Sequence, residues 1–153
     1  NIFYGHQDVL YLGNLDSKRD WGYAPEYCEA MYRMLQLESP EDFVIATNTC
    51  YTVRDFAQKA FLQVGIDIEW LGSGINEIGI NSKTGKKVVA VHPEFFRPCE
   101  VDLLIGDYSK AKQILNWQPT TNLDKLVEIM IQADLKLIQD AKFYKADKVI
   151  ATV

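Results

Sequence analysis

The chain has 153 residues, which is the length of one ordinary domain or of about one half of a two-domain enzyme. Hydrophobic residues make up 48% of the chain and charged residues 24%, so it is neither disordered nor fibrous. The formal net charge of −5 argues against nucleic acid or an anionic membrane as partner, because both need a basic surface, but it permits one small anion held by a few arginines.

The cysteines and the apolar runs indicate the compartment. Cys28, Cys50 and Cys99 are odd in number and far apart, and no CxxC pair occurs, so we expect free thiols, no disulfide framework and no metal site. No apolar run approaches the about 20 residues of a membrane span. The chain begins with Asn1 rather than Met and shows no signal-peptide pattern, so we expect a piece of a longer protein in the reducing cytoplasm.

In the first third of the chain, the pattern predicts two strands and one helix. Residues 9–12 form a short apolar run that predicts a strand, whereas residues 16–22 are too charged and broken for a regular element. Pro25 suits the first turn of a helix over residues 26–37. Residues 43–47 are β-prone without polar alternation, which is typical of a strand buried on both faces of a parallel sheet.

The rest of the chain alternates predicted helices and strands. Thr52 and Asp55 have the spacing of a capping box, and Gly65 is a suitable end for the helix that follows. We predict further strands at residues 66–70, 87–91 and 101–104, with a loop or a hairpin turning at 83–85 between the first two. Further helices are predicted at 109–115, capped by Asp107, and from a cap at Thr121 to about residue 139, followed by a weakly patterned tail at 141–153.

The loop after the first strand holds the first candidate binding group. Asn14, Lys18 and Arg19 supply an amide, an ammonium and a guanidinium, and arginine can bind a phosphate with two parallel hydrogen bonds. The alternative is a solvated charged loop in which Arg19 pairs with Asp16 or Asp20.

A second candidate group lies at Arg97 and Glu100. Pro93 and Pro98 stiffen this loop, so a guanidinium held there would be pre-organised for an anion. A carboxylate at Glu100 could accept hydrogen bonds from ribose hydroxyls. The alternative is an ion pair between Arg97 and Glu100 themselves.

Other patterns are too weak to assign a function. Gly72 and Gly74 follow a strand, but the spacing departs from GxGxxG and no helix follows, which favours a loop. Two YxxxK pairs and both histidines lack the partners that catalysis needs, so we predict structural roles for Tyr108, Lys112, Tyr144, Lys148, His6 and His92.

Together, the loops resemble a known family. Residues 13–22 read GNLDSKRDWG and residues 96–102 read FRPCEVD, which resemble the GNLxxKRDWG and FRPxEVD motifs of the GDP-mannose 4,6-dehydratases. These enzymes are extended short-chain dehydrogenases/reductases, and the resemblance covers roughly residues 8 to 138 in a single register.

The resemblance implies a reaction, a cofactor and a set of binding residues. Such enzymes use NADP to oxidise the sugar of GDP-mannose at C4, eliminate water across C5 and C6, and return the hydride to C6. The product, GDP-4-keto-6-deoxymannose, leads to fucose and related sugars. By resemblance, Asn14, Lys18 and Arg19 approach the diphosphate and Arg97 binds a phosphate. Glu100 would contact the ribose or orient Arg97.

The resemblance also implies the architecture. The predicted class is α/β: residues 1–51 would form the last strand and helix of a Rossmann-type parallel sheet with a substrate loop at 13–23, and residues 52–140 a small mixed α/β substrate-binding domain. No catalytic or cofactor-binding position of the family has a counterpart here, so the chain alone is expected to be inactive. The full enzyme is expected to form dimers or tetramers.

Two alternatives remain open. One is a related sugar-nucleotide epimerase or reductase with another base or sugar. The other is a non-catalytic partner that binds sugar nucleotides.

Overall fold

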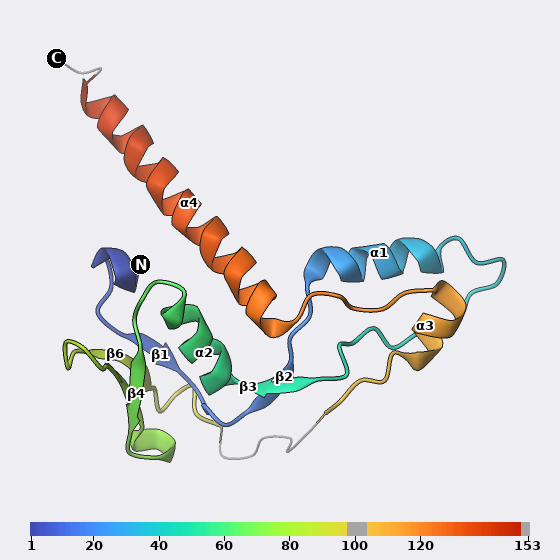
Figure 1. Cartoon of the computed structure of the whole chain (residues 1–153), viewed down its shortest axis with the longest axis horizontal. Coiled ribbons are helices and arrows are strands. Elements are labelled where there is room, and N and C mark those ends of the chain that lie inside the picture. Colours follow the sequence, from blue (N-terminus) through green and yellow to red (C-terminus); the bar gives the residue numbers. More distant parts are fainter. Residues whose placement is uncertain (98–103, 151–153) are drawn as a thin grey trace.

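The computed structural model of the chain is a mixed α/β structure with two packed parts, at the left and right of Figure 1. It describes the backbone of residues 1–97 and 104–150 and the side chains of residues 1–97 and 104–140. The α/β class predicted from the sequence is confirmed. The elements in chain order are η1 (Ile2–Tyr4), β1 (Leu10–Leu12), β2 (Lys18–Asp20), α1 (Ala24–Met34), β3 (Cys50–Thr52), α2 (Val53–Leu62), β4 (Ile68–Leu71), η2 (Gly74–Asn76), β5 (Ile78–Asn81), β6 (Lys87–Val91), α3 (Ser109–Leu115) and α4 (Leu123–Ile150).

A four-stranded mixed sheet forms the first part, with strand order β1-β6-β5-β4. β1 pairs with β6 in parallel, whereas the β4–β5 and β5–β6 pairs are antiparallel, so the predicted hairpin is present with β5 as an additional strand. The core of this part contains Phe61 of α2 with Ile68, Val88 and Val89 of the sheet. The apolar run Val88–Val91 of β6 is therefore buried.

A helical layer forms the second part, in which α1 packs against α3. Its core contains Ala30 of α1, Ala111 and Leu115 of α3, and Trp117. A two-stranded antiparallel ribbon of β2 and β3 lies between the two parts in Figure 1. β1 belongs to the sheet of residues 68–91 and α1 packs on α3, so both parts contain residues from each side of residue 51. The domain boundary at residue 51 stays a prediction.

The predicted strand at 43–47 is wrong. This segment pairs with no strand among the residues that the structure describes, although Phe43 and Ile45 pack against the core around Trp117. The N–H of Thr47 instead donates to the carboxylate of Asp20, at 2.8 Å to Oδ2. A strand requires hydrogen bonds to a neighbouring strand, and an apolar run cannot supply that neighbour.

Four further predictions need correction. Residues 16–22, predicted as irregular, contain strand β2, because its three charged residues pair with β3. The cap of α4 is Asn122, whose Oδ1 accepts from the N–H of Lys125 at 2.9 Å, whereas Thr121 binds Glu26. α4 also extends to Ile150, through most of the predicted tail. Of the predicted strand at 101–104, residues 101–103 lie outside the described residues and Leu104 is not in a strand.

The capping box of α2 is confirmed. The N–H of Asp55 donates to Oγ1 of Thr52 at 3.0 Å, and the N–H of Thr52 donates to Oδ2 of Asp55 at 2.9 Å. Gly65, which follows the helix, has a φ of 75°. This value lies in the left-handed region, where glycine is unstrained. Local sequence therefore fixes the start of this helix, which carries Arg54 in its first turn.

Glu26 fastens α1 to the segment before α4. Its Oε1 accepts hydrogen bonds from the backbone and hydroxyl groups of Thr120 and Thr121, at 2.6 to 3.2 Å. Burial raises the pKa of this carboxyl, but the four hydrogen bonds together outweigh burial and hold its pKa below the ordinary value of 4.5. A lowered pKa in the folded state means that this stabilisation is present above the unfolded-state pKa and is lost as pH falls through the folded-state pKa.

We therefore expect Glu26→Gln to lower the urea midpoint of unfolding at neutral pH, and we expect its difference from the natural chain to shrink as the pH falls below 4.5. Urea titrations followed by circular dichroism across that pH range measure both effects. Glu29→Gln is the control, because Glu29 pairs with Arg33 on the surface of the same helix and such pairs contribute little. A difference for Glu26→Gln that stays constant down to acid pH would contradict this account.

Candidate functional site

The candidate site lies where the parallel strands β1 and β6 end. Because the two strands run in the same direction, Leu12 and Val91 finish at the same edge of the sheet. The N–H of His92 donates to the carbonyl oxygen of Leu12 at 2.8 Å, which holds the two following loops together at their starts. In open α/β sheets, ligands bind in the crevice beyond such carboxyl ends.

Gly13 brings the two loops into contact. A Cβ at this position would lie against the carbonyl oxygen of Phe95, closer than any real side chain approaches. Only glycine therefore allows this approach. The contact brings the loop that starts with Asn14 alongside the loop that carries Arg97, two positions after Phe95. The structure thus brings together two loops that are distant in the sequence.

The predicted residues within these loops differ in their placement. Oδ1 of Asn14 accepts the N–H of Asp16 at 3.0 Å, so this side chain shapes its own turn. Arg97 is exposed in the second loop, where an anion could reach it. Glu100 lies outside the described residues.

Lys18 and Arg19 do not form the single cationic group that the sequence suggests. Both are exposed and belong to β2, where Lys18 pairs with Thr52 and Arg19 with Tyr51. Side chains of consecutive strand residues point to opposite faces. A guanidinium nitrogen of Arg19 also donates to the carbonyl oxygen of Lys18 at 2.7 Å. Lys18 and Arg19 therefore leave the ribbon of β2 and β3 on opposite faces.

The aromatic residues that follow hold β2 against its neighbours. Trp21 packs on the ring of Phe56, with 4.6 Å between ring centroids, and its Nε1 lies 3.4 Å from the carbonyl oxygen of Tyr51. Gly22 faces the ring of Tyr27 so closely that a Cβ would overlap it. Burial, followed by the charges of Asp20 and Glu26, raises the pKa of this phenol. The RDWG portion of the motif thus fixes the position of the loop as well as supplying Arg19.

Sequence reasoning missed Arg54, which is central to the loop. Its guanidinium lies 2.6 Å from Oδ1 of Asp16 and also pairs with the carboxylate of Glu77. The same guanidinium lies over the ring of Trp70, at 5.2 Å from the ring centroid. Within the sequence, Arg54 reads as an ordinary residue of a helix start, and Glu77 as part of a glycine-rich loop. The signal that could have found them is an acidic residue amid apolar ones, since a buried carboxylate needs a cation.

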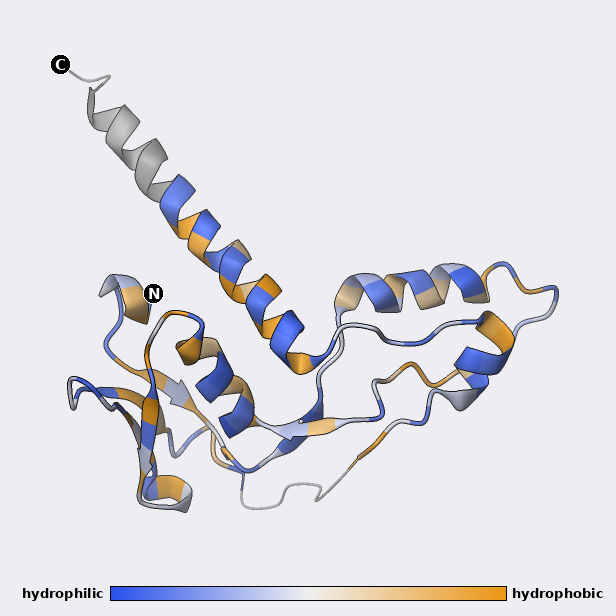
Figure 2. Cartoon of the chain, in the orientation of Figure 1, coloured by the Kyte–Doolittle hydropathy of each residue, from blue (hydrophilic) through white to orange (hydrophobic). Residues whose placement is uncertain are grey.

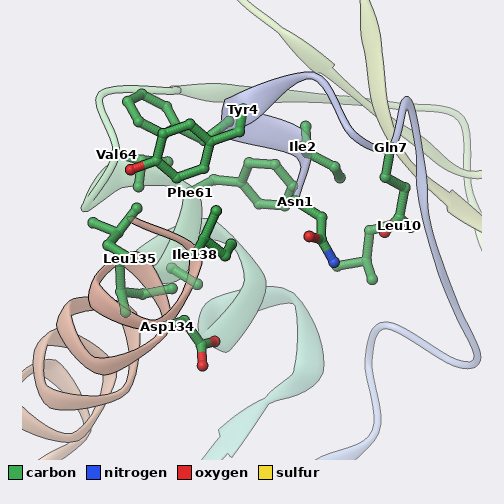
Figure 3. Close-up of a pocket in the computed structure, with 13 residues that line it drawn as sticks. Asn1, Ile2, Tyr4, Gln7, Leu10, Phe61, Val64, Asp134, Leu135 and Ile138 are labelled. Atoms are coloured by element: carbon green, nitrogen blue, oxygen red, sulfur yellow. The ribbon is translucent and has the colours of Figure 1, made fainter. Parts of the chain in front are cut away.

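A pocket of about 290 Å³ lies at another place on the sheet, between η1, α2 and α4 (Figure 3). Ile2, Phe61, Leu135 and Ile138 line it, together with Gln7 and Leu10 near the start of β1. It is therefore near the amino end of β1, away from the paired loops. Its lining contains Asp134 but no lysine or arginine among the described residues, which does not suit a diphosphate.

The remaining candidates pack as structural residues where the structure describes them. Tyr108 meets the ring of Trp117 edge-on, with 6.0 Å between centroids, and His92 packs between Tyr11 and Phe95. The side chains of Tyr144 and Lys148 are not described. Across the described residues, no group of three or more His, Cys, Asp or Glu side chains gathers as a metal site, and no helix has the length and apolar character to cross a membrane.

The sequence profile of a protein family described as GDP-mannose 4,6 dehydratase matches residues 1–130. The chain belongs to the GDP-mannose 4,6-dehydratase family. The GDP-mannose 4,6-dehydratase of Sinorhizobium fredii (strain HH103) is 49% identical over 141 residues, which are 92% of this chain and 40% of that protein. The GDP-mannose 4,6 dehydratase of Homo sapiens is 50% identical over 138 residues, which are 90% of this chain and 37% of that protein. The chain thus spans about two fifths of the length of these relatives.

Solved structures show the same fold at low sequence identity. UDP-glucose 4-epimerase with UDP-glucose from Thermotoga maritima has a TM-score of 0.66 at 20% identity, and the match covers 90% of this chain and 37% of that chain. RMD from Pseudomonas aeruginosa complexed with NADPH has a TM-score of 0.64 at 12% identity, covering 86% of this chain and 37% of that chain. The fold of this chain is therefore present as part of each of these longer chains.

Proposed function

We propose that this chain is the substrate-binding part of a GDP-mannose 4,6-dehydratase, with the diphosphate of GDP-mannose lying beyond the carboxyl ends of β1 and β6. The observation that carries this proposal is the contact of Gly13 with Phe95, which joins the two motif loops. Arg97 would bind a phosphate, with Asn14 and one of Lys18 and Arg19 on the diphosphate side. Glu100 would contact the ribose or orient Arg97.

The described residues do not fit a nicotinamide cofactor. A pyrophosphate site needs a glycine-rich turn that leads from a strand into a helix. Gly72 and Gly74 follow β4, but they lead into η2 and β5 instead. NADP would therefore be held by a part of the enzyme other than these residues, and it would supply the hydride chemistry. The role of this chain is to bind and orient the sugar nucleotide.

An exposed apolar surface supports the proposal that another part of the enzyme packs against this chain. Val44, Leu104 and Ile105 are exposed. Figure 2 shows hydrophobic residues at the start of the described segment that leads into α3. The two segments are neighbours, because Gly106 lies against the Cβ of Ala46. Surfaces of this kind mark contacts with another domain or subunit. We propose that the cofactor-binding part covers this surface, and that the complete enzyme is a cytoplasmic dimer or tetramer.

Titration of the chain with GDP, followed by amide NMR shifts, tests the binding role. We expect saturable shifts at Gly13, Asn14 and the residues around Phe95, because these loops surround the proposed diphosphate position. UDP and dTDP are the comparison ligands, since preference for either would favour a related epimerase or reductase. No shift in these loops at saturating GDP would refute a GDP-binding role.

A chimera tests the dehydratase role. The chain would replace the matching region of the Sinorhizobium fredii enzyme, to which it is 49% identical. We expect the chimera to convert GDP-mannose to a product lighter by one water, detected by mass spectrometry. A folded chimera that binds GDP without forming this product would favour the non-catalytic alternative.

A further inference from the structure

Arg54 connects the two loops of the candidate site. Its Nη2 lies 2.6 Å from Oδ1 of Asp16, in the first loop, and 3.0 Å from Oε2 of Glu77. The backbone oxygen of Glu77 accepts the N–H of Val91 at 3.3 Å, where β6 passes into the second loop. A chain of contacts therefore runs from Asp16 through Arg54 and Glu77 to the start of the loop that carries Arg97.

The burial of Glu77 makes this chain of contacts rigid. Glu77 is 4% exposed, and a buried carboxylate is tolerated when a cation and hydrogen bonds compensate for its lost hydration. Arg54 supplies that cation, and Trp70 covers the guanidinium plane. The guanidinium is thus held in one orientation, in which Nη2 binds both Glu77 and Asp16.

The start of α2 adds two backbone contacts to the same loop. The N–H of Arg54 donates to the carbonyl oxygen of Leu15 at 2.9 Å, and the N–H of Val53 donates to that of Ser17 at 3.0 Å. Asp16 lies between these two anchored residues. Its carboxylate is the side-chain contact that ties the middle of the loop to the buried Arg54–Glu77 pair.

We propose that Arg54 is a positioning residue, which sets the distance between the two sugar-nucleotide-binding loops by holding Asp16 and Glu77 at the same time. The proposal rests on the proposed function, because it assumes that the diphosphate lies between these loops. Arg54 acts through Asp16 and Glu77 and needs no contact with the ligand. Without the link to Asp16, the turn between Leu15 and Ser17 would lose its side-chain connection to Glu77 and the second loop, although its backbone contacts with α2 would remain.

The variant Asp16→Asn tests the proposal, because the direction of the change in GDP affinity distinguishes a positioning role from a purely electrostatic one. Removing a carboxylate beside an anion site strengthens anion binding when the charge has no other role. If Asp16 positions the loop, the same change weakens GDP binding instead. We expect Asp16→Asn to raise the dissociation constant for GDP roughly tenfold, the size typical of residues coupled in one network.

The control is Asp124→Asn. Asp124 and Asp16 are equally exposed, with 69% of each side chain accessible, and each pairs with a cation of α2. Asp124 pairs with Lys59, at 2.5 Å, and has no part in the loop contacts described above. Both variants should keep the melting temperature of the natural chain, because exposed pairs add little stability. We expect Asp124→Asn to leave GDP binding unchanged.

Arg54→Lys provides the second measurement, on a variant expected to remain folded. Lysine keeps the charge beside Glu77 but lacks the planar fork that reaches two carboxylates. GDP binding should weaken as it does for Asp16→Asn, and the double variant should bind no more weakly than either single variant. GDP binding that strengthens or stays unchanged in Asp16→Asn, or additive losses in the double variant, would overturn the positioning role. Absence of binding by the natural chain would instead refute the proposed function.

Discussion

Trp117→Ala is expected to destabilise the chain by about 3–5 kcal/mol, the range for removing a large aromatic side chain from a core. Trp117 is 2% exposed and fills the space between α1 and α3, where it meets the rings of Tyr27 and Tyr108. Its indole Nε1 also donates to the carbonyl oxygen of Glu26 at 2.8 Å. The substitution removes both the packing and this hydrogen bond. Urea unfolding followed by circular dichroism measures the loss.

Two controls separate the packing of Trp117 from its hydrogen bond. Trp117→Phe retains most of the ring volume, so it should cost about 1–2 kcal/mol, much of it from the lost hydrogen bond to the carbonyl oxygen of Glu26. Leu35→Ala alters an exposed residue just after α1 and should change stability by less than about 0.5 kcal/mol. If Trp117→Ala unfolds at the same urea concentration as Leu35→Ala, the core around α1 and α3 is described wrongly.

Arg97→Ala is expected to weaken GDP binding by about 2 kcal/mol, the lower end of the range for truncating one partner of a charged hydrogen-bonded pair. That loss corresponds to a roughly thirtyfold higher dissociation constant. Arg97 is exposed in the chain without ligand, so the substitution should leave the melting temperature unchanged. Calorimetric titration with GDP and thermal unfolding measure the two quantities on the same samples.

The control for Arg97 is Lys83→Ala. Lys83 is an exposed cation in the turn between β5 and β6, near the end of β6 opposite to Arg97. Lys83→Ala removes one positive charge, as Arg97→Ala does, so any general effect of charge on GDP binding appears in both variants. Arg97→Lys should recover part of the affinity, because a phosphate still meets a cation. Equal affinity of Arg97→Ala and Lys83→Ala for GDP would exclude the phosphate-binding role.

The sequence predicted those elements whose signals are local. The start of α2 depends on Thr52 and Asp55, three residues apart, and the structure has the predicted capping box. The strand predicted at 43–47 failed because an apolar run does not determine whether a neighbouring strand exists. β2 was missed because its three residues are charged and carry no local strand signal. They form a strand only by pairing with β3, which lies far along the chain.

The candidate site was predictable in its motifs but not in its geometry. The resemblance predicts Asn14, Lys18, Arg19, Arg97 and Glu100 as binding residues, and the structure brings the two motif loops together. That Lys18 and Arg19 face opposite sides follows from a strand that the sequence pattern hid. Glu77 and Arg54 are separated by a helix and a strand, so their pairing depends on the complete fold. The roles of Glu77 and Arg54 in the site remain predictions until GDP binding is measured.

The parallel pairing of β1 with β6 has a consequence for how the chain folds. The two strands are separated by most of the chain's other elements, so closing this contact costs loop entropy that no local contact repays in advance. Contacts of this range form late and slowly compared with helices. Recovery of GDP binding after dilution from denaturant should therefore follow the slowest folding phase, after the α-helical signal has returned. A ligand bound between these loops would mark molecules that have completed folding.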